Sequence, residues 1–194
     1  MDRPSLAQEK AEIRRRARRA RAALTAEEKR AADGAIRRAV LASAAYAQAK
    51  TLFAYVSTEG EPDTRALIEA ALRDGKRVYV PKCLGKTMLA VPFPGWDGME
   101  TGPLGILEPR VWTETAEAEE IDLTLTPCVT ASPDGGRLGH GGGYYDRFFQ
   151  SGETEKVCLC YEALLTEKVP TAYWDARMDA LVTERGWRKC ETET

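Results

Sequence analysis

The sequence predicts an α/β fold: a single-domain, three-layer sandwich with a mostly parallel, Rossmann-like sheet and helices on both faces. Two observations carry this prediction. One is a glycine-rich segment that follows a strand pattern and leads into a helical pattern, the order of a ligand-binding crossover. The other is a set of short apolar or alternating runs, most with helical patterns between them: 51–56, 77–81, 121–126, 156–161 and 180–183. The 194 residues are enough for one domain with a substantial core, which we expect to span 1–194.

The first two patterns along the chain are helical. Residues 5–24 place small and apolar side chains on one stripe at helical spacing, and Lys10, Arg14 and Arg21 lie beside it. A solvated basic face is the commoner meaning of such a pattern, and a cationic clamp for phosphate groups is the functional one. The spacing leaves both open. Thr25-Ala26-Glu27-Glu28 is a capping box, so a second helix is predicted from there to about Ala45.

A strand, a helix and a second strand are predicted next. The run 51–56 ends in a polar loop, after which Asp63 or Thr64 can cap a helix. Gly75 ends this helix, and the strand 77–81 follows it. The residues of the helix that should face inward are Leu67, Ile68, Ala71 and Leu72.

Residues 82–120 do not follow the alternation of strand and helix. A short strand is predicted at 88–91, and closely spaced prolines and glycines between 92 and 105 predict an irregular excursion. A loop this long in a compact domain is usually functional or mobile. Trp96 and Trp112 serve either as core anchors or as ligand contacts, and their spacing does not decide between the two.

The second half of the chain supplies three further strands and a short edge strand at 186–188. Ligands of parallel α/β sheets bind at the carboxyl ends of the strands. We therefore expect the loops after Val56, Pro127 and Tyr161 to lie near one another, because each follows a predicted strand.

The segment Arg137–Phe149 has four glycines around His140: Gly139, Gly141, Gly142 and Gly143. Glycine at this density carries a conformational entropy cost, which is tolerated where the backbone turns sharply or approaches a ligand. Helical spacing resumes after the glycines, so they lead into a helix N-terminus, where free N–H groups favour an anion such as phosphate. The segment matches neither the P-loop nor the dinucleotide fingerprint, and a flexible connection is the alternative.

Charge and composition exclude several classes of protein. The net charge of −2 predicts no nucleic-acid partner, and no apolar run approaches the roughly 20 residues that span a bilayer. The region from Asp2 to Arg21 is charged and lacks the apolar core of a signal peptide. Five scattered cysteines, without a Cys-x-x-Cys pair, and one histidine argue against a structural zinc site. We expect a cytoplasmic protein with reduced cysteines and no membrane partner, in which Cys158 and Cys160 pack within a strand.

The segment RLGHGGGYYDRFF resembles the signature of the 5-formyltetrahydrofolate cyclo-ligase family, whose members are also called methenyltetrahydrofolate synthetases. Lys10 and Arg14 resemble the Lys-x-x-x-Arg pair of the family's first helix, and the signature is specific in combination with this pair. Further segments resemble the family pattern nearly from end to end: 61–64, 105–109, 122–127, 175–179 and 183–184.

The resemblance implies an ATP- and Mg²⁺-dependent enzyme. Family members join the 5-formyl group of 5-formyltetrahydrofolate to N10 and so form 5,10-methenyltetrahydrofolate, ADP and phosphate. The formyl oxygen is a poor leaving group, and phosphoryl transfer from ATP activates it for the attack by N10. Such a transfer needs positioning and charge neutralisation more than covalent help from the protein. The implied partners are a reduced folate and ATP, and we expect a monomer.

The resemblance also implies roles for residues of this chain. The ATP-binding residues would be Lys10, Arg14, Arg137, Leu138, Gly139, His140, Gly141, Gly142, Gly143, Tyr144, Tyr145 and Asp146. The folate-binding residues would be Val56, Glu61, Gly141, Gly142, Gly143 and Tyr144. The catalytic residues would be Arg14, Arg137 and Tyr145. Asp146 and Asp175 would bind magnesium, which prefers carboxylate and water oxygens. By its position alone, Asp146 is also a first-turn acid that complements the helix dipole.

Four residues depart from the family pattern: Leu104, His140, Leu164 and Trp174. They leave most of the nucleotide side intact, while Leu104 falls on the folate side, so they bear on the exact substrate more than on the use of ATP. Two alternatives therefore stand beside the leading hypothesis. One is an ATP-dependent relative that acts on a different substrate, and the other is a folate- or nucleotide-binding protein without turnover.

Overall fold

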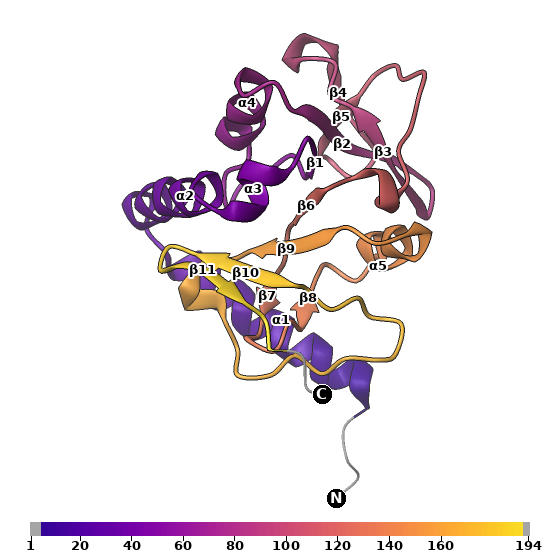
Figure 1. Ribbon diagram of the computed structural model, residues 1–194. Helices are drawn as coiled ribbons and strands as arrows, with labels where there is room; N and C mark the ends of the chain where they lie inside the picture. Colours follow the sequence, from indigo (N-terminus) through magenta and orange to yellow (C-terminus); the bar gives the residue numbers. More distant parts are fainter. Residues whose placement is uncertain (1–4, 192–194) are drawn as a thin grey trace, which may run out of the picture.

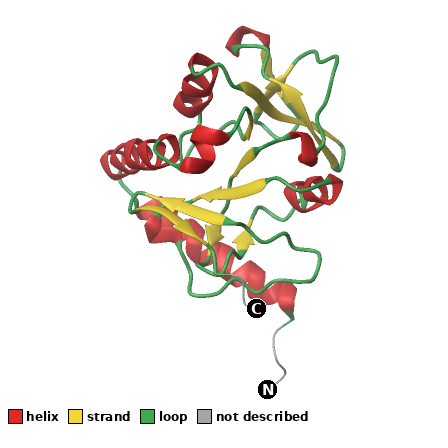
Figure 2. Ribbon diagram, viewed as in Figure 1, coloured by secondary structure: helices red, strands yellow, loops and turns green. Residues whose placement is uncertain are grey.

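The computed structural model describes residues 5–191 and has the mixed α/β fold that the sequence predicts (Figure 1; Figure 2). The ends of the predicted 1–194 domain, residues 1–4 and 192–194, lie outside the described residues. The helices are α1 (Leu6–Ala23), α2 (Ala26–Leu41), α3 (Ala44–Gln48), α4 (Arg65–Arg73) and α5 (Tyr144–Phe148). Short 3₁₀ turns are η1 (Trp96–Gly98), η2 (Ala118–Glu120), η3 (Phe149–Ser151) and η4 (Glu162–Leu164).

A seven-stranded sheet forms the centre of the molecule. Its strands are β1 (Thr51–Ala54), β2 (Arg77–Leu84), β3 (Thr87–Pro92), β6 (Leu123–Thr126), β9 (Glu155–Leu159), β10 (Ala180–Thr183) and β11 (Gly186–Lys189). The order is β11-β10-β9-β6-β1-β2-β3, in which the five inner strands pair in parallel and the two edge strands are antiparallel. The predicted mostly parallel sheet, including the edge strand near 186–188, is therefore confirmed.

Helices cover the sheet from two sides. In Figure 1, α2, α3 and α4 lie to one side of β1 and α5 lies to the other. Phe53 of β1 packs against Tyr145 and Phe148 of α5, with ring centroids 6.1 and 5.0 Å apart. Its neighbours Leu52 and Ala54 are also fully buried, and side chains alternate along a strand, so β1 is covered on both faces.

Local capping explains where the helices begin, and it corrects one prediction. Ser5 and Thr25 form capping boxes at the starts of α1 and α2. The second helix does not run to Ala45 as predicted, because Ser43 begins the separate helix α3. The Ser43 hydroxyl accepts a hydrogen bond from Tyr46 N over 3.1 Å and so caps that new helix.

Helix α4 begins at Arg65, directly after Thr64, and ends before Gly75, as predicted. Asp63 supplies the side-chain cap, since its Oδ1 accepts from Arg65 N over 3.1 Å. The prediction that Leu72 faces inward is wrong: Leu72 is 43% exposed. The buried stripe consists of Leu67, Ile68, Ala70 and Ala71. At about 100° per residue, Leu72 falls beyond the edge of that stripe.

The strand boundaries differ from the predictions by a few residues. β1 ends at Ala54 and not at Val56, and β9 ends at Leu159 and not at Tyr161, because pairing in the sheet stops there. β2 continues past residue 81 to residue 84, because the antiparallel hairpin with β3 extends the pairing. The residues that follow β1 and β9 remain buried although they lie outside the strands, so the loops gain length at the carboxyl edge of the sheet.

The excursion 82–120 is more regular than predicted. It contains β3 and a small hairpin of β4 (Met99–Thr101) with β5 (Leu107–Pro109). Trp96 packs edge-on against Phe93, and its indole N–H donates to Glu69 over 3.1 Å. Trp112 lies 5.0 Å from Lys82 Nζ, so both tryptophans make structural contacts.

A second small hairpin pairs β7 (Thr130–Ala131) with β8 (Arg137–Leu138) and leads into the glycine segment. The five cysteines are free, and Cys158 and Cys160 are buried as predicted. Among residues 5–191, no helix combines the length and the apolar character that crossing a membrane requires.

Candidate active site

A cavity of about 810 Å³ lies at the carboxyl ends of β1 and β6. Every residue that the sequence analysis assigned to the site lines it. These residues come from α1, from the turn after β1, from the glycine segment with α5, and from the loop before β10. The tip of the β4–β5 hairpin and the β2–β3 hairpin complete the wall. The structure thus brings together the predicted residues, and it adds a wall from the excursion.

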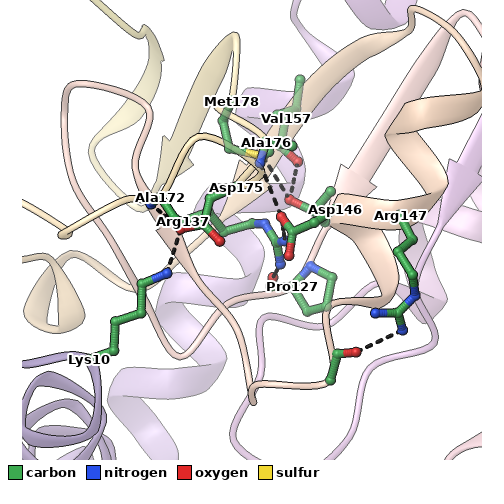
Figure 3. A network of polar contacts seen from close by, with 12 residues as sticks. Lys10, Pro127, Arg137, Asp146, Arg147, Val157, Ala172, Asp175, Ala176 and Met178 are labelled. Carbon is green, nitrogen blue, oxygen red and sulfur yellow. Dashed lines mark hydrogen bonds and ion pairs between the residues drawn. The ribbon is translucent and has the colours of Figure 1, made fainter. Parts of the chain in front are cut away.

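Lys10 of α1 forms an ion pair with Asp175 from the loop before β10 (Figure 3). Both side chains are 15% exposed. The same carboxylate oxygen, Asp175 Oδ2, also accepts from Ala172 N over 2.7 Å. Lys10 is therefore not part of a solvated basic face, because it points into the cavity and holds the Asp175 loop against α1.

Arg137 and Asp146 form the second ion pair of the site, 3.0 Å apart (Figure 3). The Arg137 side chain is 5% exposed, and its Nη1 donates to Pro127 O over 3.4 Å. Its Nε is buried without a hydrogen-bond partner among the described residues. A buried donor without an acceptor costs free energy. The Arg137 guanidinium therefore does not serve the fold alone, and its positive charge is available to a ligand in the cavity.

Asp146 does more than complement a helix dipole. Its Oδ1 accepts from Arg137 and from Ala176 N, the latter over 3.2 Å. In Asp146 and in Asp175, a single carboxylate oxygen takes all the hydrogen bonds that the described residues make to the group. The second oxygen of each is left for another ligand. No group of three or more His, Cys, Asp or Glu side chains within residues 5–191 forms a metal site by itself.

The glycine segment is fastened at several points. Arg14 Nε donates to Gly139 O over 2.8 Å, while its Nη nitrogens make no hydrogen bond to described residues. At the other end, Arg147 donates to Gly142 O over 2.8 Å and to the backbone of the β2–β3 turn. Gly143 has a left-handed φ of 65° and is the N-cap of α5, a conformation that favours glycine. These contacts hold the glycine segment in one conformation, so it forms a wall of the cavity and is not a flexible connection.

Tyr145 lies beneath this wall and is 8% exposed. Its ring centroid is 5.4 Å from the Arg137 guanidinium carbon, and its hydroxyl makes no hydrogen bond to the described residues. Burial raises the pKa of the Tyr145 phenol, and it outweighs the lowering effect of Arg137. Tyr145 is thus a neutral hydrogen-bond donor at neutral pH, not a base.

Glu61, in the turn after β1, is a further carboxylate that lines the cavity, and its side chain is 8% exposed. Its Oε2 accepts from Thr58 N over 2.9 Å and from Thr58 Oγ1 over 2.8 Å, and its Oε1 lies 3.8 Å from His140 Nε2. Burial alone would raise the pKa of Glu61, but His140 and the Thr58 hydrogen bonds outweigh it and lower the pKa. Glu61 therefore presents an ionised carboxylate to the cavity at neutral pH.

The rest of this side is apolar. Val56, Met88, Leu104 and Ile106 line it, and Leu104 at the tip of the β4–β5 hairpin is 52% exposed. The excursion is thus functional in the sense that it encloses the cavity. Sequence reasoning missed Met88, because it carries no local motif and the β2–β3 hairpin reaches the cavity only through its tertiary contact with α5. It also missed Arg147, which lies within the segment 137–149 but is not distinguished there as a lining residue.

Comparison with known proteins gives consistent results. The family model described as the 5-formyltetrahydrofolate cyclo-ligase family matches residues 6–184. The chain is 33% identical to the 5-formyltetrahydrofolate cyclo-ligase of Haemophilus influenzae, over 90% of this chain and 98% of that protein. It is 34% identical to the enzyme of the same name from Escherichia coli, over 70% of this chain and 78% of that protein.

The solved structure of 5,10-methenyltetrahydrofolate synthetase from Aquifex aeolicus is also similar. It superposes with a TM-score of 0.83 at 28% identity and covers 95% of this chain and 94% of that chain. The likeness extends over the elements that build the cavity, so the site described here lies in a shared architecture.

Proposed function

The chain belongs to the 5-formyltetrahydrofolate cyclo-ligase family, and on this premise we propose that its cavity converts 5-formyltetrahydrofolate into 5,10-methenyltetrahydrofolate with ATP and Mg²⁺. One observation carries the proposal. A single cavity of about 810 Å³ joins a wall of cations and carboxylates to an apolar wall with one buried glutamate. ATP and a reduced folate have these two complementary characters.

ATP phosphates fit the first wall. Lys10, Arg14 and Arg137 supply positive charge, and the N–H groups at the start of α5 have no intrahelical partner. The residues from Leu138 to Tyr144, His140 included, form the backbone surface between these cations. This arrangement resembles neither of the usual glycine-rich phosphate motifs, and its positive charge comes from two segments far apart in the sequence, α1 and β8.

The two carboxylates fit a magnesium ion. Mg²⁺ is usually held by one or two carboxylates, waters and substrate phosphates, and Asp146 and Asp175 each keep one oxygen without a protein partner. These are the residues that would hold the ion. When bound, Mg²⁺ would neutralise charge on the phosphates of ATP.

The proposed reaction moves one phosphoryl group and closes one ring. The formyl oxygen forms a bond to the γ-phosphorus while the bond from phosphorus to the oxygen of ADP breaks. N10 attacks the formyl carbon, the carbon–oxygen bond breaks to release phosphate, and N10 loses its proton. The carbon then bridges N5 and N10. Negative charge on the phosphoryl oxygens is neutralised by the cations of the first wall.

Within this reaction, each catalytic candidate has a limited role. The free Nη nitrogens of Arg14 and the buried guanidinium of Arg137 stabilise the transferring phosphoryl group. Tyr145 donates a hydrogen bond from its neutral hydroxyl and takes no proton. No side chain has to form a covalent intermediate, which agrees with the charge of the two arginines and the neutral state of the Tyr145 phenol.

The folate occupies the second wall. Val56 and the hairpin residues cover its rings, and the ionised Glu61 carboxylate accepts a hydrogen bond from an N–H group of the pterin. The segment from Gly141 to Tyr144 lies between the two walls, so it contacts both ligands and brings the formyl oxygen towards the γ-phosphate.

The direct test is to mix the protein with Mg-ATP and 5-formyltetrahydrofolate and to follow the near-ultraviolet absorbance of the methenyl product. The expected result is product with an equal amount of ADP. ADP formed only with a different acceptor would support a relative with another substrate. Binding of both ligands without ADP would support a binding protein without turnover.

The setting of the reaction is also a proposal. We expect a cytoplasmic protein, because the five cysteines are free and free thiols persist in a reducing compartment. We also expect this protein to be a monomer. Size-exclusion chromatography with light scattering would test the monomer, and a dimer mass would contradict it.

A further inference from the structure

Three hydrogen bonds fasten the turn that carries Glu61 from behind. Each bond holds one backbone group of three consecutive residues. The groups are the carbonyl of Glu61, the carbonyl of Pro62 and the N–H of Asp63. Tyr55, directly after β1, donates its hydroxyl to Pro62 O over 2.7 Å. The other two bonds come from Asp33 and Tyr161, which do not line the cavity.

Asp33 lies on α2, and Tyr161 follows β9. Asp33 Oδ1 accepts from Asp63 N over 3.2 Å. The Tyr161 hydroxyl lies 2.8 Å from the same Asp33 oxygen and 3.1 Å from Glu61 O, so its single proton is shared between these two acceptors. Tyr161 is 2% exposed and Asp33 is half-buried, so these contacts form in a partly buried place.

These bonds fix the backbone that presents Glu61. Its side chain accepts hydrogen bonds from Thr58 within the turn and lies 3.8 Å from His140 Nε2, so its direction also depends on the peptide units of the turn. Without Asp33, the Asp63 N–H loses its partner and Tyr161 loses one of its two acceptors. The Glu61 carboxylate would then be free to move away from the position at which it meets a ligand.

We propose that Asp33 and Tyr161 are positioning residues for Glu61 and that they set the affinity for the folate but not for ATP. This inference rests on the proposed function, in which Glu61 contacts the folate. It assigns a role in substrate binding to two residues that lie 128 positions apart in the sequence, behind the cavity wall.

The test compares Asp33→Ala, Asp33→Asn and Tyr161→Phe. We expect Asp33→Ala to raise KM for 5-formyltetrahydrofolate by about 5- to 10-fold, because the Asp63 N–H loses its acceptor and Tyr161 loses one of its own. Tyr161→Phe should raise it by roughly threefold, because it removes one hydroxyl proton that two acceptors share. In both variants kcat and KM for ATP should stay within about twofold. Asp33→Asn should be close to the wild type, because its amide oxygen still accepts both bonds.

A matched control exists in the same chain. Tyr46 donates its hydroxyl to Asp74 over 2.6 Å and so joins α3 to the end of α4, away from the cavity. Tyr46→Phe removes the same kind of bond and should leave both KM values unchanged. An equal rise in KM for the folate in Tyr46→Phe would show that Asp33 and Tyr161 contribute only stability, and the inference would fail.

Two further measurements separate this inference from the proposed function. Calorimetric titration of 5-formyltetrahydrofolate gives its Kd even if turnover is absent. Asp33→Ala should raise this Kd by the same factor by which it raises KM for the folate. If the wild type does not bind this folate, both proposals are wrong. If the wild type binds and turns it over while Asp33→Ala binds it equally well, only this inference is overturned.

Hydrogen exchange provides the structural readout. The Asp63 amide should exchange faster with solvent in Asp33→Ala than in the wild type, while the amides of β1 keep their protection. Unchanged protection of Asp63 would contradict the positioning role, because the turn would then not depend on Asp33.

Discussion

The two walls of the cavity are built in different ways. The phosphate wall consists of charged side chains held by paired contacts, such as Lys10 with Asp175 and Arg137 with Asp146. The folate wall is mostly apolar and is shaped by backbone, through the β4–β5 hairpin and the fastened turn at Glu61. The phosphate wall would bind its ligand through charge, and the folate wall would bind its ligand through complementary shape. Substitutions should therefore act on ATP at one wall, and on folate or on the fold at the other.

The largest effect is expected where the folate wall depends on a buried charge pair. Lys82 Nζ lies 2.9 Å from Glu108 Oε1, and both side chains are 8% exposed. Glu108 Oε2 also accepts from Cys83 N, which ties β5 to β2. Glu108→Ala leaves Lys82 without this partner, so we expect a loss of about 3 kcal/mol in the free energy of unfolding.

The control for that variant is Glu114→Ala. Glu114 pairs with Arg77, but both side chains are more than half exposed, so the loss should stay below about 1 kcal/mol. Urea unfolding measures both variants. A loss for Glu108→Ala as small as that of Glu114→Ala would mean that the buried pair does not hold the hairpin.

The next effect concerns turnover at the phosphate wall. Asp146→Asn keeps the size of the side chain but removes its charge, so kcat should fall by roughly 100- to 1,000-fold if Asp146 helps to hold Mg²⁺. Turnover measured against magnesium concentration checks this. A near-normal rate with unchanged magnesium dependence would remove Asp146 from the metal site.

Lys10→Ala should have a smaller effect, on binding rather than on the chemical step. A hydrogen bond to a charged group contributes about 1.5–3 kcal/mol, so KM for ATP should rise at least about tenfold. Alanine keeps α1 helical. Arg19→Ala removes an exposed cation from the same helix and should leave KM for ATP unchanged. Equal effects of the two variants would show that Lys10 does not bind ATP and serves only its ion pair with Asp175.

The smallest effect belongs to the exposed tip of the folate wall. Leu104→Ala removes apolar contact from a half-exposed residue, so KM for the folate should rise only about two- to fivefold, with no change for ATP. Steady-state kinetics with each substrate varied in turn would show this. A change in KM for ATP of the same size would mean that Leu104 does not belong to the folate wall alone.

The phosphate wall was easier to predict from the sequence than the folate wall. The capping box at Thr25 and the dense glycines before α5 are local patterns, and local patterns predict local structure. The break of the second helix at Ser43 was missed because an alanine-rich helical pattern continues across it. The boundaries of β1 and β9 depend on pairing with other strands, which no local pattern contains.

Residues of the folate wall come from contacts between distant segments. The β2–β3 hairpin reaches the cavity because Tyr144 donates its hydroxyl to Gly85 O over 2.8 Å, a contact across 59 positions. The bond between Asp33 and Tyr161 likewise has no signal in the spacing of residues. For the candidate site, family resemblance brought together residues that spacing alone left as alternatives, and their assigned roles stay predictions.

The division of the cavity into two walls is tested most directly by crossed binding measurements. ATP and 5-formyltetrahydrofolate are titrated separately into Lys10→Ala and Glu61→Gln, and each Kd is compared with that of the wild type. We expect Lys10→Ala to weaken ATP by about tenfold and the folate by less than about twofold, and Glu61→Gln to do the reverse. If either variant weakens both ligands equally, the two walls are not separate sites and the account is wrong.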